Sequence, residues 1–235
     1  MCTVVVDVAA DAIRLLAVRD EDPHRPWDSW GEWWPETFAD VWGVRDREAG
    51  GAWMAANMVD PRVAVVVNRA TTISTTDTVP LQSRGSLALE SVWGRSPQPP
   101  LHMHGFHLLE ATPDAARILT WDGGDLVETV IPEGVHMLAH DDLDDARTPR
   151  ITAWLHRFRA DKDRLGDMWS NDWHVAWEHT LQESTEVPPT DDRAIIRDNR
   201  PHGYPTQSLV YVFAEITANG VSVREQILPR PGHWG

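Results

Sequence analysis

Cys2 is the residue of this sequence best suited to covalent chemistry, because it follows the initiator methionine and is the only cysteine among 235 residues. If Met1 is removed, Cys2 carries a thiol and a free α-amine together. An α-amine has an ordinary pKa of about 7.7–8.0, so part of it is neutral near pH 7 and can accept the thiol proton. The alternative interpretation is a small buried hydrophobe that opens a β-strand.

A cluster of charged residues, Val18-Arg19-Asp20-Glu21, follows shortly after. If residues 3–8 and 13–18 pair as a hairpin through Ala-Ala-Asp-Ala, the cluster returns to the neighbourhood of Cys2. A guanidinium beside the sulfur favours the thiolate, so Arg19 is expected to lower the pKa of Cys2. A carboxylate from Asp20 can orient the α-amine. The alternative is a surface charge cluster that opens a polar loop.

Short strands are expected to position these residues. The predicted strands cover residues 3–8, 13–18, 52–57, 62–68, 106–111, 116–121, 126–131, 208–216 and 221–228. Three helices are predicted: residues 81–93, a helix with Thr148 as N-cap and Pro149 at its first position, and a helix with Ser170 as N-cap. The predicted order begins with hairpins, continues with helices and ends with a further hairpin. This order predicts an α+β fold with largely antiparallel sheets.

The order of several short motifs resembles the NRDE family, whose eukaryotic member is transport and Golgi organisation protein 2. The motifs are Met1-Cys2-Thr3, Val18-Arg19-Asp20-Glu21, Arg25-Pro26, Gly50-Gly51-Ala52-Trp53-Met54-Ala55, a strand ending in Asn68, Ser83-Arg84-Gly85, Gly105-Phe106-His107-Leu108 and the closing hairpin after Gly203. The resemblance runs over nearly the whole chain.

The resemblance implies a fold of the N-terminal-nucleophile hydrolase type, a four-layer αββα sandwich with two largely antiparallel sheets. Similar enzymes of the penicillin V acylase and bile-salt hydrolase group cleave amides with an N-terminal cysteine. By position, Cys2 is expected to be the nucleophile, Arg19 its electrostatic partner and Asp20 the amine-binding carboxylate. Asn68 is expected to stabilise a tetrahedral oxyanion.

The sequence departs from the family pattern at three places. Val18 replaces the asparagine that names the family, and His140 stands where the family usually has an asparagine. Histidine can donate to an oxyanion, so His140 stays a candidate catalytic residue. The segment Tyr204-Pro205-Thr206-Gln207-Ser208 lacks an arginine that relatives often carry.

These observations predict an N-terminal-cysteine amidohydrolase that cleaves a small non-peptide amide with an apolar acyl group, without a cofactor. Two alternatives stay open. One is a haem-binding or haem-trafficking protein on the same fold, with haem as its ligand; the other is a scaffold without chemistry. If the side chains of Arg19 and Asp20 point away from Cys2, that geometry would favour the scaffold without chemistry.

Aromatic and histidine residues supply further candidates. Trp27, Trp30, Trp33 and Trp34 follow the charged cluster and are expected to line a substrate pocket, or else to anchor a long loop onto a sheet edge. In the segment His102-x-His104-x-x-His107, alternating histidines on a strand point the same way, so two ligands are geometrically possible; without an acidic or cysteine partner nearby, no metal site is predicted.

The length and composition of the chain favour a single domain over residues 1–235, and this domain is expected to act on a small molecule. Its 36 acidic and 21 basic residues give a formal charge of −15, which disfavours nucleic acid and anionic lipid. Asp7 and Asp11 interrupt the apolar N-terminal segment, so a signal peptide is not expected, and no apolar run is long enough for membrane insertion. A single cysteine excludes an intrachain disulfide, which fits the reducing environment of the cytoplasm. The oligomeric state does not follow from the sequence.

Overall fold

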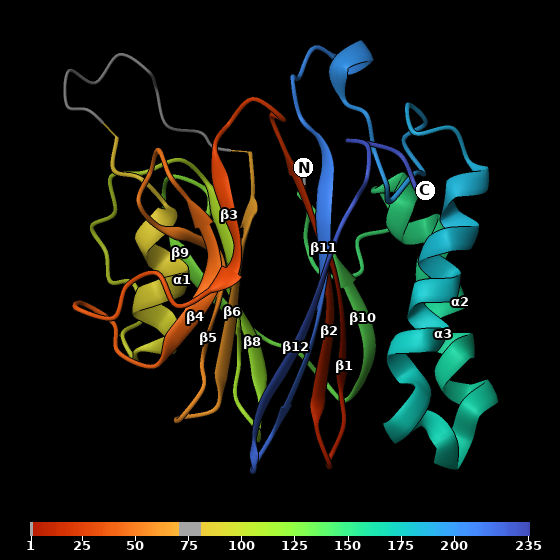
Figure 1. Ribbon diagram of the computed structural model, residues 1–235, viewed down its shortest axis with the longest axis horizontal. Helices are drawn as coiled ribbons and strands as arrows, with labels where there is room; N and C mark the ends of the chain where they lie inside the picture. The colour runs from red at the N-terminus through yellow and green to blue at the C-terminus, as the bar shows by residue number, and fades with distance from the viewer. Residues whose placement is uncertain (1, 71–80) are drawn as a thin grey trace.

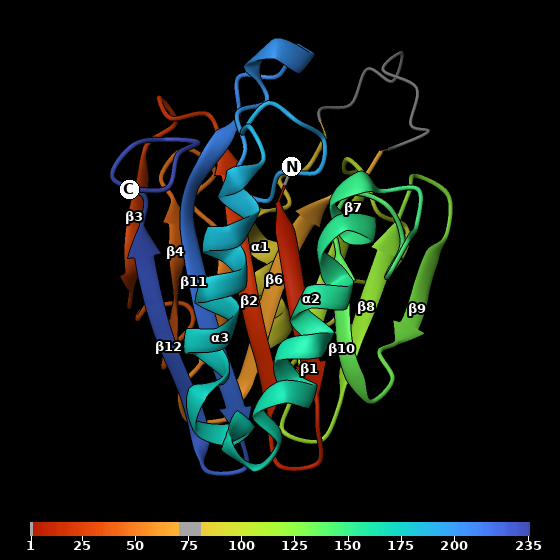
Figure 2. The same ribbon diagram turned by 90° about the vertical axis from the view of Figure 1, so that its right-hand side faces the viewer.

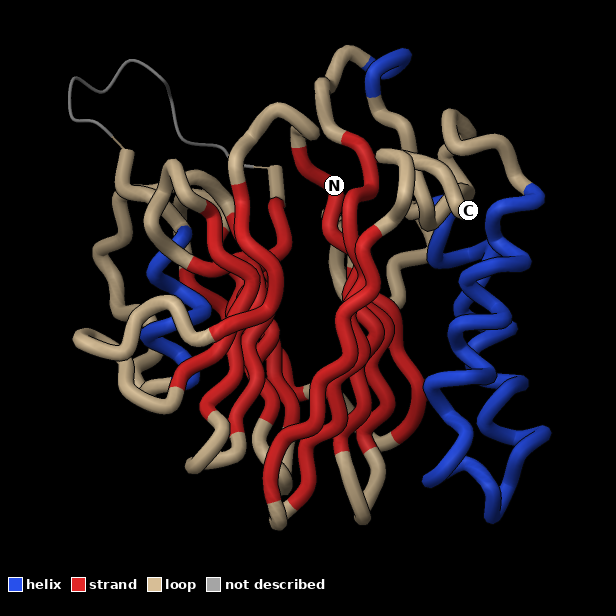
Figure 3. Tube along the Cα trace, in the orientation of Figure 1, coloured by secondary structure: helices blue, strands red, loops and turns tan. Residues whose placement is uncertain are grey.

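The computed structural model describes residues 2–70 and 81–235, and its elements form four layers (Figure 1). Two antiparallel sheets lie face to face in the centre. Helix α1 (Gly85–Val92) covers the outer face of one sheet, and helices α2 (Pro149–Leu165) and α3 (Trp169–Glu183) cover the outer face of the other (Figure 3). The predicted α+β fold, an αββα sandwich, is confirmed.

The first sheet holds the N-terminus of the chain and has five strands. In spatial order they are β10 (Gly134–Leu138), β1 (Thr3–Val8), β2 (Ile13–Glu21), β11 (Gln207–Thr217) and β12 (Gly220–Ile227). The predicted hairpins at residues 9–12 and 218–219 are both present. Strand β1 is therefore a central strand, with β2 on one side and β10 on the other.

The second sheet has seven strands in sequence order. They are β3 (Trp27–Gly31), β4 (Val41–Asp46), β5 (Ala52–Asn57), β6 (Arg62–Asn68), β7 (Phe106–Ala111), β8 (Ala116–Trp121) and β9 (Leu126–Val130). Each strand pairs with the next one along the chain, so the whole sheet is built from local antiparallel connections.

Three apolar clusters fill the spaces between the layers. Strand alternation divides β1 between two of them: Val4 and Val6 face the other sheet, whereas Val5 faces α2 and α3. In Figure 2 these two helices lie in front of the five-stranded sheet. Trp173, Trp177 and Leu181 of α3 are buried against that sheet, as their fourfold spacing predicted. The third cluster lies between α1 and the seven-stranded sheet.

Several predicted element boundaries are wrong. The helix predicted from residue 81 begins at Gly85. The third helix begins at Trp169 after a 3₁₀ turn at Gly166–Met168, so Ser170 lies inside the helix and is not its N-cap. The Ser170 hydroxyl instead hydrogen-bonds to the Asp11 carboxylate at 3.4 Å. In the described part of the chain, no helix has the length and apolar character needed to cross a membrane.

The tryptophan-rich segment after the charged cluster, in which no strand is predicted, contains β3 and β4. Glycine and charged residues dilute the apolar alternation there, and the pairing of β4 with β5 supplies the order that local sequence does not show. Strand β10 was also missed, for a similar reason: it has five residues and depends on its pairing with β1.

Candidate active site

Cys2 lies directly before β1, at the end of that strand where β2 ends. Thr3 pairs with Val18, so the next pair along the hairpin sets Cys2 opposite Arg19. The Cys2 side chain is 5% exposed and packs in the cluster between the two sheets. Its Sγ lies 3.9 Å from the main-chain oxygen of Asp20. The predicted return of the charged cluster to Cys2 therefore occurs.

Arg19 shares the face of the sheet on which Cys2 lies. Its guanidinium lies 3.6 Å from the Glu21 carboxylate and 5.7 Å from the centre of the Trp27 ring. The side chain is buried, and its Nη1 has no hydrogen-bond partner within the described residues. The N–H groups of a buried guanidinium nitrogen without a partner can donate to an oxygen of a ligand at little further desolvation cost.

Asp20 is held by groups on β11 and in the segment before it. Its carboxylate accepts hydrogen bonds from Ser208 Oγ at 2.6 Å and from Asn199 Nδ2 at 3.5 Å. Ser208 is the residue that pairs with Asp20 across β2 and β11. These bonds fix the carboxylate beside the end of β1, where its charge acts on the thiol.

A cavity of about 460 Å³ opens beside Cys2, between residues of both sheets and the start of α1. Its lining is Cys2, Arg19, Asp20, Glu21, Arg25, Asp46, Ala49, Ala52, Trp53, Val66, Asn68, Leu81, Gln82, Ser83, Arg84, Gly85 and His104. Asn68 ends β6, and its side chain is exposed. The structure thus brings Cys2, Arg19, Asp20 and Asn68 together in one cavity.

His140 lies near this group but is not part of the described cavity lining. Val4 pairs with Leu138, so continuation of that register places His140 close to Cys2. Its Nε2 is 3.4 Å from the Asp141 carboxylate. Burial lowers the pKa of His140; Asp141 opposes this shift, and Arg150 and Arg197 reinforce it. A neutral imidazole next to the site is the result, and its catalytic role stays a prediction.

The four tryptophans predicted to bind substrate lie elsewhere along β3 and after it. Trp27 and Trp30 pack against the core between the sheets, and Trp34 packs against the α1 side. Trp33 is 37% exposed, with the Arg45 guanidinium 4.7 Å from its ring centre. The described lining of the Cys2 cavity includes none of the four. Trp53 of β5 does line the cavity beside Cys2, although its place in the motif Gly50-Gly51-Ala52-Trp53-Met54-Ala55 predicts no role for it.

The expectation that Arg19 lowers the thiol pKa is wrong in its net direction. Burial raises the pKa of the Cys2 thiol, and the Asp20 carboxylate raises it further. The positive charge of the chain's N-terminus lowers this pKa, and Arg19 also acts in the expected sense, but its effect is the smaller of the two. The physical reason is that a thiolate loses its hydration when enclosed between two sheets. At neutral pH the Cys2 sulfur is therefore a thiol that needs a base.

The three histidines near residue 105 do not act as a group. His104 is exposed and lines the Cys2 cavity, whereas His107 is buried in β7. Arg69 is an obligate donor to His107 Nε2 at 3.1 Å, so Nδ1 carries the proton and faces Thr120 Oγ1 at 2.9 Å. Within residues 2–70 and 81–235, no three metal-ligating side chains converge.

His107 predicts a loss of stability in mild acid. Burial lowers its pKa to about 4, with a smaller contribution from Arg69, whereas the unfolded chain titrates near 6.5. Between these values the unfolded state binds more protons, so the free energy of unfolding falls as the pH drops from about 6.5 to about 4, by up to about 3 kcal/mol. Urea unfolding across this range should show a shallower pH dependence for His107→Gln. The same change at His179, whose side chain is 68% exposed, should leave the slope unaltered.

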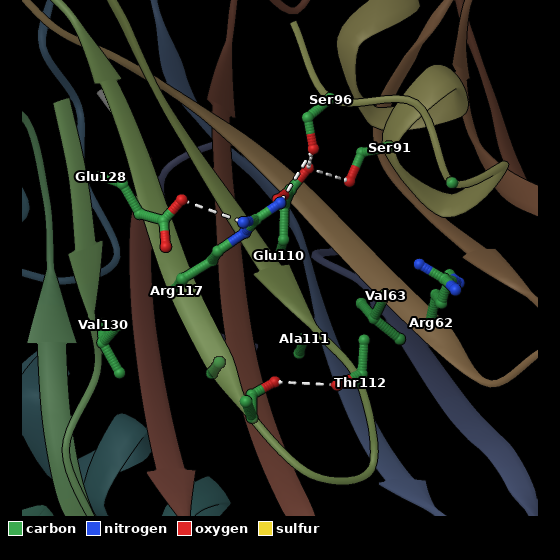
Figure 4. Close-up of a pocket in the computed structure, with 13 residues that line it drawn as sticks. Arg62, Val63, Ser91, Ser96, Glu110, Ala111, Thr112, Arg117, Glu128 and Val130 are labelled. Carbon is green, nitrogen blue, oxygen red and sulfur yellow. Dashed lines mark hydrogen bonds and ion pairs between the residues drawn. The ribbon is translucent and has the colours of Figure 1, made fainter. Parts of the chain in front are cut away.

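A second cavity, of about 400 Å³, lies on the other face of the seven-stranded sheet (Figure 4). Its charged groups all have partners among the described residues. Arg117 Nε donates to Glu110 at 2.7 Å and Nη1 to Glu128 at 2.9 Å, and Ser91 Oγ donates to Glu110 at 2.7 Å. Arg62 pairs with Asp60 at 2.8 Å. This network ties α1 to β7, β8 and β9, and it is best explained as structural.

Comparisons with known proteins identify the family of the chain. A search of curated proteins found no match. A family model described as Transport and Golgi organisation 2 matches residues 1–160, well over half of the 235 residues. The matched range contains Cys2, Arg19, Asp20, Asn68 and His140 and ends within α2, so the groups that hold Asp20 from β11 lie outside it. The chain belongs to the Transport and Golgi organisation 2 family.

Proposed function

We propose that this chain is an N-terminal-cysteine amidohydrolase that cleaves a small non-peptide amide with an apolar acyl group. The observation that carries the proposal is the position of Cys2, with its sulfur in a cavity shared with Arg19, Asp20 and Asn68. Ala52, Trp53 and Val66 give one part of this cavity an apolar lining that suits the acyl group. Because Arg19 faces the same way as Cys2 and Asp20 is fixed beside it, the arrangement fits a functional site better than a scaffold without chemistry.

The raised thiol pKa decides how the nucleophile is activated. A protonated thiol needs a base, and removal of Met1 places one on the same residue, the Cys2 α-amine. The amine takes the thiol proton and the sulfur attacks the amide carbon, so the carbonyl π electrons move onto oxygen. The protonated amine then gives its proton to the leaving nitrogen as the carbon–nitrogen bond breaks. Water attacks the resulting thioester, releases the acid and restores the thiol.

Two cavity groups can stabilise the oxyanion formed in the first step. Asn68 offers a side-chain amide, and Arg19 Nη1 offers donors that no described residue uses. A fixed donor aimed at a developing oxyanion contributes about 10²–10³ in rate. Asp20, held by Ser208, keeps a negative charge beside the positive form of the amine. Asn68 and Arg19 thus act on the oxyanion, whereas Asp20 acts on the amine and Cys2 is the nucleophile.

The first test asks whether the base exists. Met1 lies outside the described residues, so its removal is measured by intact-mass spectrometry. A cyanobenzothiazole reagent, which condenses only with a cysteine that has both a free thiol and a free α-amine, should label the urea-unfolded protein. The matched control inserts alanine between Met1 and Cys2; it keeps the thiol, is not labelled, and should lose hydrolysis of N-acyl amides. Quantitative retention of Met1 in an active preparation would contradict the mechanism.

The alternative, haem binding without catalysis, is favoured by one observation in the same cavity. His104 is exposed there and could serve as an axial ligand, with cavity arginines to pair with carboxylates. A haemin titration followed at the Soret band separates the two functions. Saturable binding that survives Cys2→Ala and is lost in His104→Ala would support the alternative. The absence of any spectral change would exclude it.

A further inference from the structure

The Cys2 cavity contains three arginines, and two of them are matched by carboxylates. Arg25 pairs with Asp46 at 2.7 Å and with Glu48 at 3.0 Å. Arg19 pairs with Glu21 at 3.6 Å. Arg84 differs, because its only described hydrogen bond runs from Nη1 to the main-chain oxygen of Gly105, at 2.8 Å. No carboxylate of the described residues lies within salt-bridge distance of Arg84.

The position of Arg84 is fixed by the packing of α1. Arg84 is the residue before the first turn of the helix, and that turn contains no acidic residue. The backbone at Gly85 lies against Gly51, where an added Cβ would be only 2.0 Å from the Gly85 oxygen. This close approach holds the start of α1 over the cavity. Arg84 therefore lines the cavity from the α1 side, whereas Cys2 lines it from the end of the five-stranded sheet at which β1 begins.

The surroundings of Arg84 favour an anionic ligand. Burial lowers the pKa of the half-buried Arg84 guanidinium, whereas the Cys2 sulfur, when deprotonated, and Glu21 oppose this shift. A guanidinium in such a position gains most from a planar anion that it can bind through two donors. The protein as a whole carries a formal charge of −15, so an anion needs a local cation of this kind to enter.

We propose that the amide substrate carries a carboxylate on its amine portion, as an N-acyl amino acid does, and that Arg84 binds this carboxylate. The inference rests on the proposed amidohydrolase function and adds the substrate class to it. The apolar lining at Ala52, Trp53 and Val66 takes the acyl group, so the charge belongs to the leaving amine. Arg84 is then the residue that determines specificity.

The test compares an N-acyl glycine with its uncharged glycinamide analogue. The unaltered protein should hydrolyse the carboxylate form with the higher kcat/KM. Arg84→Met should reduce the ratio of the two kcat/KM values by about 10- to 100-fold, the range expected for a hydrogen-bonded charge pair. Arg84→Lys, which keeps the charge but loses the paired donors, should give an intermediate ratio. Arg95→Met is the control, because Arg95 is 65% exposed, pairs with Glu90 and lies outside the described lining of the Cys2 cavity, so its ratio should not change.

A binding measurement separates failure of this inference from failure of the amidase proposal. Calorimetry on Cys2→Ala, which cannot turn over, should detect the N-acyl glycine, and the added change Arg84→Met should weaken that binding by a similar factor. Carboxylate binding without hydrolysis by the unaltered protein would overturn the amidase proposal and with it the substrate assignment. Hydrolysis of both amides with equal kcat/KM, or an equal loss for both in Arg84→Met, would overturn the role of Arg84 alone.

Discussion

Replacing Cys2 by alanine is expected to lower the rate of amide hydrolysis by a factor of about 10⁴ or more, because covalent catalysis is lost with the sulfur. Alanine at position 2 also permits removal of Met1, so the α-amine remains and the substitution isolates the thiol. Cys2 is buried between the sheets, and loss of its sulfur should cost only about 1 kcal/mol of stability. The measurement is kcat/KM on an N-acyl amide, with circular dichroism to verify the fold.

Cys2→Ser is the matched variant for this experiment. A hydroxyl keeps the nucleophile–amine arrangement but is much harder to deprotonate, so residual hydrolysis above that of Cys2→Ala is expected. The cavity cations and Asn68 are unaltered in both variants. If Cys2→Ala retained more than a tenth of the activity, the nucleophile would have to be another group, and the cavity beside Cys2 would lose its proposed role.

The part of the site that could be predicted from sequence is the part that local structure builds. Cys2 and Arg19 are joined by one short hairpin, and the alternating aliphatic residues on both sides of its turn identify that hairpin. Asn68 could be placed because it ends a strand with a clear apolar pattern. Each of these positions depends on contacts within about twenty residues or on a recognised motif.

The groups that complete the site come from pairings distant in sequence. Ser208 and Asn199 hold Asp20 across about 180 residues, as their separations of 188 and 179 show. No local pattern sets the register between β2 and β11, which also contains an irregularity between Ser208 and Val210. Arg84 belongs to the motif Ser83-Arg84-Gly85, but only the packing of α1 brings it to the cavity lining.

The direction of the thiol pKa is the clearest case in which residue types alone misled. An adjacent arginine predicts a thiolate, and the sequence contains that arginine. Whether burial outweighs the arginine depends on how closely the second sheet covers the first, which is a property of tertiary packing. The correction changes the expected mechanism, since the α-amine must act as the base.

A charged residue inside β1 has a structural role that the sequence showed only as an interruption of an apolar segment. Asp7 has no exposed surface and faces the helical layer. Its carboxylate accepts hydrogen bonds from Lys162 Nζ at 2.6 Å and from Trp169 Nε1 at 2.7 Å, and Arg14 Nη1 lies 3.8 Å away. Asp7 thus joins the central strand to α2 and α3.

Asp7→Asn is expected to lower the free energy of unfolding by about 3 kcal/mol, because it leaves the Lys162 ammonium without its buried counter-charge, whereas Arg14 keeps Asp11 and Glu215. Asparagine has nearly the same shape and keeps an oxygen for Trp169, so the loss reports charge. The measurement is urea unfolding at pH 7. The control is Asp60→Asn, which removes an exposed pair with Arg62 and should change stability by less than about 1 kcal/mol. Adding Lys162→Met to Asp7→Asn should restore part of the loss, because one stranded cation is then absent. Equal effects of Asp7→Asn and Asp60→Asn would show that the buried pair does not hold the helical layer on the sheet.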